Sequence, residues 1–142
     1  MGVFRVRATI WNVQEPSKRT DVDLLVDTGS TYTVIPQSVL EKLGVVSIRT
    51  VRLRLADNRV IERPLGEVGI EIEGFRATAT PAVFGEDDVY LLGSVTMEQL
   101  GLAPDPVEKR LKPVEALLMN SSSNLQRHRN MNGSYTSAKV ST

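Results

Sequence analysis

The chain has 142 residues, and its 17 lysines and arginines are balanced by 17 aspartates and glutamates. This length suits one domain with a substantial core, and the balanced charge argues against nucleic acid or an acidic membrane as a partner. The sequence has no cysteine and one histidine, His128. Disulfides and thiol nucleophiles are therefore excluded, and a Ser–His–Asp triad or a His-rich metal site is disfavoured. We expect no metal and no cofactor, which leaves carboxylates as the agents of acid–base chemistry.

The amino-terminal residues suggest where the protein resides. Residues 1–11 include two arginines and no apolar run of signal-peptide length. The sequence also lacks a run of about 18 apolar residues, the length that a transmembrane helix needs. We therefore expect a cytoplasmic protein without a membrane partner.

Strand patterns dominate residues 3–119. Residues 3–11 alternate between apolar and polar side chains, as a strand with one buried face does. Further strands, each a short apolar or alternating run, are expected at 21–27, 31–35, 68–72, 75–84, 89–92 and 114–119. Two short helices are expected at 37–43 and 95–100, because Pro36 opens the first and a glycine follows the end of each. This order predicts an all-β fold with two short helices.

A β-hairpin is expected over residues 51–62. Residues 51–55 alternate strictly, and apolar residues resume at Val60. Between these runs, Asp57 and Asn58 tolerate the positive φ angles of a tight hairpin turn.

The composition changes after residue 119. Residues 120–142 contain few large apolar side chains and no acidic residue. Such a segment cannot bury enough surface to offset the entropy of ordering it. We therefore expect a folded domain over residues 1–119 and a disordered polar tail over 120–142.

Two segments of the chain are similar to one another. Residues 33–45 align without gaps on residues 90–102, and the glutamate, leucine and glycine at the end of each expected helix coincide. Upstream, the first copy has Asp-Thr-Gly-Ser at 27–30, whereas the second has Phe-Gly-Glu-Asp at 84–87. A duplicated half-domain fits this pattern, with the chemical residues in one half only.

The chemical residues are those at 27–30, which directly follow an apolar run at 24–26. An acid just past a buried strand, followed closely by glycine, predicts a loop whose backbone N–H groups can hold the carboxylate and tune its pKa. The alternative is an ordinary Asx turn at the end of a strand.

In this context the sequence resembles the single-domain, retropepsin-like aspartic proteases of the prokaryotic type. Three features carry the resemblance: the apolar strand that ends in Asp-Thr-Gly-Ser at 24–30, the Leu-Leu-Gly element at 91–93 before a short helix, and the alternating hairpin between them. The resemblance covers about residues 3–119. It implies a closed β-barrel domain in which the hairpin is a flap.

The resemblance also implies a homodimer, because one Asp-Thr-Gly per chain cannot supply two catalytic carboxylates. Asp27 from each protomer would share a proton and activate a water for peptide-bond hydrolysis. Thr28 would brace the pair by bonding across the dimer. Gly29 would donate its N–H to the carboxylate and contact the substrate main chain, and Ser30 would orient the outer carboxylate oxygen.

The flap would close over a peptide or protein substrate and exclude water. Its expected substrate contacts near the tip are Leu55, Ala56, Asp57 and Asn58. Four arginines cluster around the hairpin: Arg52, Arg54, Arg59 and Arg63. We expect these to be solvated, as charged residues usually are. If they line the cleft, they would favour acidic residues in a substrate.

Two other functions compete with the peptidase. A catalytically inactive, dimeric peptide-binding domain could use the same fold, since fold does not fix function. A phosphate loop of an actin- or hexokinase-like ATPase is the other reading of residues 27–31, but such folds need two domains and a second phosphate loop.

Overall fold

The computed structural model describes residues 3–118, and in this range the expected all-β fold with two short helices is confirmed. The elements are β1 (Arg5–Asn12), β2 (Arg19–Val26), β3 (Thr33–Pro36), α1 (Gln37–Lys42), β4 (Arg49–Arg54), β5 (Val60–Ile72), β6 (Phe75–Gly85), β7 (Leu91–Leu92), α2 (Ser94–Leu100), β8 (Leu102–Asp105) and β9 (Arg110–Pro113). The tail expected at 120–142 lies outside the described residues.

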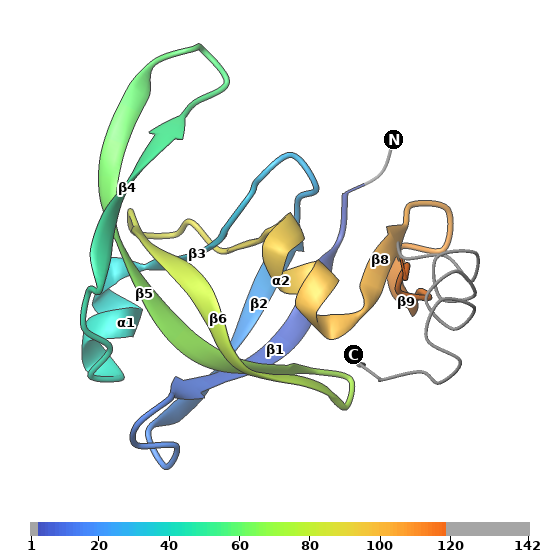
Figure 1. Ribbon diagram of the computed structural model, residues 1–142, viewed down its shortest axis with the longest axis horizontal. Coiled ribbons are helices and arrows are strands. Elements are labelled where there is room, and N and C mark those ends of the chain that lie inside the picture. The colour runs from blue at the N-terminus through green and yellow to red at the C-terminus, as the bar shows by residue number, and fades with distance from the viewer. Residues whose placement is uncertain (1–2, 119–142) are drawn as a thin grey trace, which may run out of the picture.

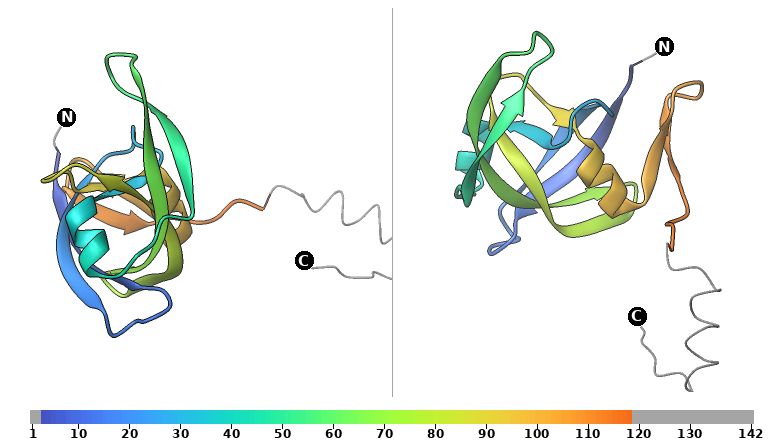
Figure 2. Two further views of the ribbon diagram at one scale, coloured as in Figure 1. Left: turned by 90° about the vertical axis from the view of Figure 1, so that its left-hand side faces the viewer. Right: turned by 45° about the horizontal axis from the view of Figure 1, so that its top comes forward.

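Six of the strands form a ring (Figure 1). The sheet order is β1-β2-β7-β3-β6-β5-β4, and β1 also pairs with β5, so the ladder returns to its first strand. A sheet that closes in this way leaves few unpaired edges. The strand β4 lies outside the ring and pairs only with the outer half of β5. Figures 1 and 2 show the resulting hairpin projecting from the body of the protein.

The strand β5 is longer than the sequence pattern suggests. We expected a hairpin arm that begins at Val60 and a separate strand at 68–72, but one strand runs from Val60 to Ile72. Pro64 does not interrupt it, because Pro64 pairs with Thr50 of β4 at a point where β6 has not yet joined. A proline has no N–H group to donate, so it is tolerated where the strand has a hydrogen-bonded neighbour on one side only.

The expected strand at 114–119 is wrong for its described part, since residues 114–118 belong to no strand. The chain instead forms a two-stranded hairpin of β8 and β9, despite Pro104 and Pro113. Both strands of such a hairpin are edges, so proline is tolerated in them. The Asp105 carboxylate lies 2.8 Å from Lys112 Nζ and also accepts backbone N–H groups of the turn, and these contacts hold its pKa below the usual range.

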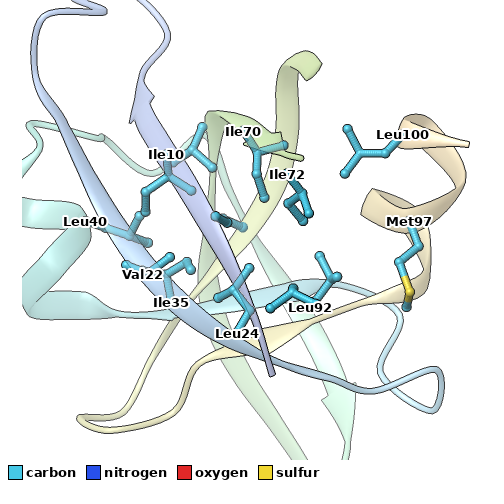
Figure 3. Packing of buried hydrophobic residues seen from close by; sticks show 14 of the residues in the cluster. Ile10, Val22, Leu24, Ile35, Leu40, Ile70, Ile72, Leu92, Met97 and Leu100 are labelled. Atoms are coloured by element: carbon cyan, nitrogen blue, oxygen red, sulfur yellow. The ribbon is translucent and has the colours of Figure 1, made fainter. Parts of the chain in front are cut away.

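The core fills the inside of the ring (Figure 3). Alternate residues of the strands point inward, as the sequence pattern of residues 3–11 predicts for Val6, Ala8 and Ile10. Residues with almost no exposed surface include Ile10, Leu24, Ile35, Leu40, Ile70, Ile72 and Leu92. The helix α2 adds Met97 and Leu100 to the same cluster. Burial of this apolar surface is the main favourable term in the folding free energy.

Trp11 packs on the outside of β5 rather than inside the ring. It lies opposite Gly69 in the ladder between β1 and β5. A Cβ atom at position 69 would lie 2.1 Å from the indole ring, so only glycine fits there. The Arg76 guanidinium lies 4.6 Å from the ring centroid in a cation–π contact. Trp11 is buried by these contacts and serves the structure.

Candidate active site

Asp27 is the first residue past the end of β2. The last residues of β2 pair in parallel with β7, with Val26 opposite Leu92. The Asp27 N–H continues this ladder by donating to the Leu92 carbonyl oxygen at 3.1 Å. The paired strands therefore fix the backbone of Asp27, while its half-buried side chain leaves the sheet for the loop that joins β2 to β3.

The loop folds back on the Asp27 carboxylate. The Gly29 N–H donates to Asp27 Oδ1 at 2.9 Å, and the Ser30 N–H donates to the Asp27 carbonyl oxygen at 3.1 Å. Gly29 does not have a positive φ, so it is not needed for a left-handed turn. A Cβ atom at Gly29 would instead lie 3.3 Å from Oδ1 and crowd this hydrogen bond. Thr28 lies between them and is exposed.

The Ser30 side chain is oriented differently from the expectation. Its hydroxyl donates to the Tyr32 carbonyl oxygen at 2.8 Å. A serine hydroxyl has one proton, and a carbonyl oxygen can only accept it. In this rotamer, Ser30 fixes the end of the loop and has no proton left to donate to the carboxylate.

The helix α2 anchors the same loop. The Ser94 N–H donates to the Ser30 carbonyl oxygen at 2.8 Å, and the Val95 N–H donates to the Thr31 carbonyl oxygen at 3.0 Å. The first N–H groups of a helix have no partner within it, and here the loop satisfies two of them. Gly93 precedes the helix, and a Cβ atom there would lie 2.4 Å from the Tyr32 carbonyl carbon. This close approach explains the glycine of the Leu-Leu-Gly element.

A chain of three buried threonine hydroxyls lies beneath the loop. Thr33 Oγ1 accepts the Gly93 N–H at 3.1 Å and lies 2.6 Å from Thr96 Oγ1. Thr96 Oγ1 in turn lies 2.7 Å from Thr80 Oγ1. None of the three residues has exposed surface. The network joins β3, β6 and α2, and the sequence analysis missed it because each threonine alone resembles an ordinary strand or helix residue.

A cleft of about 700 Å³ lies between the loop and the hairpin of β4 and β5. Figures 1 and 2 show that the hairpin projects on the same side of the molecule as the loop between β2 and β3. The cleft is lined by Gly29, Ser30, Thr31, Tyr32, Val34, Arg52, Leu53, Arg54, Leu55, Arg59, Ile61, Arg63, Val83, Gly85, Glu86, Val89 and Leu91. The loop and the hairpin, which are distant in sequence, thus share one concave surface, as small-molecule and peptide sites usually do.

The hairpin tip is a three-residue turn. The Leu55 N–H donates to the Arg59 carbonyl oxygen, and the Asn58 N–H donates to the Leu55 carbonyl oxygen, each at 2.8 Å. Asn58 has a φ of 75°, which confirms that an asparagine takes the left-handed position of this turn. Of the four expected contact residues, Leu55 lines the cleft, while Ala56, Asp57 and Asn58 form the exposed turn beyond it.

The arginines of the hairpin contribute to the cleft, and three of them, Arg52, Arg54 and Arg59, are exposed as expected, whereas Arg63 is half-buried. Arg52, Arg54, Arg59 and Arg63 all contribute to its wall. The Arg59 guanidinium contacts the Asp57 carboxylate at 2.7 Å, and this contact lowers the pKa of Asp57. Sequence reasoning did not name Tyr32, Ile61 or Val83 as cleft residues. The alternation of the hairpin strands places Ile61 on the same face as Leu53, and this pattern could have identified Ile61 as a cleft residue.

Within residues 3–118, no group of three or more Asp, Glu, His or Cys side chains is placed to hold a metal ion. In the same range, neither helix combines the length and the apolar character needed to cross a membrane.

Comparison with known proteins identifies the family. Residues 12–102, well over half of the chain, match the aspartyl protease family. No curated protein matches the chain. The matched segment includes the loop with Asp27, the hairpin, the Leu-Leu-Gly element and α2. The chain therefore belongs to the retropepsin-like aspartyl protease family.

Proposed function

We propose that the protein is an aspartic endopeptidase in which two copies of the chain each contribute Asp27 to one active site. The observation that carries this proposal is the Asp27 carboxylate, which accepts the Gly29 N–H just past the end of β2, in a loop whose next residues, Gly29 and Ser30, line a cleft together with the hairpin. Membership of the aspartyl protease family supports peptide bonds as the substrate.

The homodimer follows from the chemistry of the carboxylates. Two carboxyl groups a few ångströms apart share one proton, so that one can act as a base while the other acts as an acid. One chain carries only one Asp-Thr-Gly, and its second half has Phe84 at the position equivalent to Asp27. A two-fold axis next to the exposed Thr28 would bring two loops together. Thr28 would then bond across the axis beneath the carboxylates.

The reaction needs no covalent intermediate. The ionised carboxylate takes a proton from a water molecule, whose oxygen attacks the carbonyl carbon of the scissile bond. The protonated carboxyl donates a hydrogen bond to the carbonyl oxygen and stabilises the charge that develops there. A proton then passes to the amide nitrogen, the C–N bond breaks, and the two peptides leave. The Gly29 N–H keeps the carboxylate oriented through these steps, and the hairpin limits access of bulk water.

The test is digestion of a peptide library by the wild type and by Asp27→Asn, with cleavage sites read by mass spectrometry from mildly acidic to neutral pH. Asp23→Asn is the matched control, because Asp23 is an exposed acid on β2, the strand that leads to Asp27. We expect cleavage by the wild type and the control and none by Asp27→Asn. Absence of cleavage by the wild type, from protein shown to be a folded dimer by analytical ultracentrifugation, would favour the non-catalytic peptide-binding domain.

Mixing of subunits tests the shared active site directly. In a freely exchanging equal mixture of wild type and Asp27→Asn, only one dimer in about four contains two wild-type chains. Activity should fall to about a quarter of that of wild type at the same total concentration. A fall to about half would show that each protomer works alone.

A further inference from the structure

The cleft combines an apolar floor with a positively charged wall. Its floor includes Leu53, Ile61, Val83 and Leu91, while its wall holds four arginines and a single acidic residue, Glu86. The chain as a whole has no net charge, so this imbalance is local to the cleft. A concave surface with one sign of charge concentrates ligands of the opposite sign.

The register of the hairpin separates the arginines into two faces. Val51 lies opposite Arg63, and Leu53 lies opposite Ile61. Residues opposite one another in an antiparallel ladder share a face, and Val51 and Leu53 pack with Tyr32 against the body of the protein. Arg63 therefore belongs to the face that is turned toward the body and the cleft.

Arg52 and Arg54 belong to the other face. Arg52 lies opposite Glu62, and Arg54 lies opposite Val60. The Arg54 guanidinium also donates to the Asn58 carbonyl oxygen at 3.1 Å, which directs it to the hairpin tip. These two arginines therefore contribute to the cleft from the hairpin face opposite to that of Arg63.

Arg63 is the arginine best placed to bind a ligand. It is half-buried, and its Nε donates to the Phe84 carbonyl oxygen at 2.9 Å, which fixes the plane of the guanidinium. Arg59, by contrast, is exposed and already paired with Asp57. Within the described part of the chain, no carboxylate lies within ion-pair distance of Arg63, although Glu86 lines the same cleft and Glu41, Glu86 and Asp87 share a second, smaller hollow with Arg63. Its terminal N–H groups are thus free of a protein carboxylate among residues 3–118.

We propose, on the basis of the proposed peptidase activity, that the cleft selects peptides with an aspartate or glutamate side chain near the scissile bond, and that Arg63 binds this carboxylate. A guanidinium held in a fixed plane matches the two oxygens of a carboxylate and forms two parallel charge-assisted hydrogen bonds. The apolar floor beside it accepts a neighbouring apolar side chain of the same peptide. Arg63 is then a specificity-determining residue and takes no part in the chemical step.

The test uses pairs of peptides that differ only by Glu or Gln at each position around a cleavage site found in the library. We expect kcat/KM of the wild type to be about tenfold higher for the Glu peptide at one position. In Arg63→Met, the ratio of kcat/KM for the Glu peptide to kcat/KM for the Gln peptide should be close to one. Arg63→Lys keeps the positive charge but lacks the planar guanidinium, and it should give an intermediate ratio. Arg7→Met is the matched control outside the cleft and should keep the wild-type ratio.

Two further measurements separate this inference from the proposed activity. Equal cleavage of Glu and Gln peptides by the wild type would overturn the inference but not the peptidase activity. The same holds if the preference for Glu persists in the Arg63→Met variant, provided that this variant is as thermally stable as the wild type. If the wild type cleaves nothing, binding of the same fluorescent peptide pairs is measured instead. Tighter binding of the Glu peptides that is lost in Arg63→Met would support the inference while the peptidase fails, and equal binding would overturn it.

Discussion

The two strand–helix units of the chain, β3 with α1 and β7 with α2, share their local structure. In each, a short strand leads into a helix of one to two turns, and a glycine with a left-handed backbone follows within two residues of the helix end. Gly44 has a φ of 76° and Gly101 a φ of 69°. The N–H of each glycine donates to the carbonyl oxygen of the equivalent glutamate, Glu41 or Glu98. The similarity of residues 33–45 and 90–102 is therefore a similarity of structure.

The units differ in what their helices contact. The helix α1 starts after Pro36, which has no N–H group to donate. The helix α2 starts after Gly93 and donates its first N–H groups to the loop that carries Asp27. Moreover, β7 lies between β2 and β3 and so supports both ends of this loop. In the second half of the chain, this local unit therefore supports the candidate active site, because of the strands and the loop that lie next to it.

The largest effect is expected from the glycine that distinguishes the second unit. Gly93→Ala would place a methyl group against the Tyr32 backbone, which cannot move without displacing the Asp27 loop. We expect a loss of about 3 kcal/mol in the free energy of unfolding, measured by urea denaturation. Pro36→Ala, at the equivalent position of the first unit, should cost clearly less. Equal losses in the two variants would contradict the difference between the units.

The buried threonines provide a second way to test this difference. Thr96→Val keeps the shape of the side chain but removes hydroxyl contacts with Thr33 and Thr80, which stay buried. We expect a loss of about 2 kcal/mol in unfolding free energy, because a buried donor is left without a partner. Val39→Thr makes the reverse change at the equivalent position of α1, which is half-buried, and should have a smaller effect. A neutral Thr96→Val would show that the network does not support the fold.

The smallest loss of stability is expected at the feature that the two units share, the left-handed glycine after each helix. Gly44→Ala and Gly101→Ala each force alanine into the left-handed region, at a cost of about 1 kcal/mol. Gly44 should be the more sensitive of the two, because a Cβ atom there would lie 3.2 Å from Asn12 Nδ2, whereas the nearest atom at Gly101 is 4.0 Å away. Thermal unfolding of both variants checks this order. A larger loss for Gly101→Ala than for Gly44→Ala would contradict this order.

Sequence reasoning succeeded where local patterns decide the structure. The alternation of residues 3–11, the glycines after the two helices and the asparagine of the hairpin turn each predict their own conformation, and the structure confirms them. The long strand β5 could not be predicted, because whether Pro64 interrupts a strand depends on which neighbours it has. The hairpin of β8 and β9 was missed for the same reason, since its prolines are tolerated only at sheet edges.

The candidate site divides in the same way. The Asp27 loop was found because its residues are contiguous and follow an apolar strand. The cleft wall and the threonine network combine residues from separate strands and a helix, and only the closure of the ring brings these together. Which arginine faces the cleft depends on the register of β4 against β5, which no single segment specifies.

The contact between Trp11 and Gly69 has an evolutionary consequence. Because a side chain at position 69 and an indole ring at position 11 exclude each other, the two sites are expected to be epistatic. A lineage is expected to acquire a side chain at 69 after the tryptophan has been replaced by something smaller, because the reverse order passes through an intermediate in which the indole ring must be displaced. In a family alignment the pair should therefore covary, with Arg76 losing its aromatic partner whenever the tryptophan is lost.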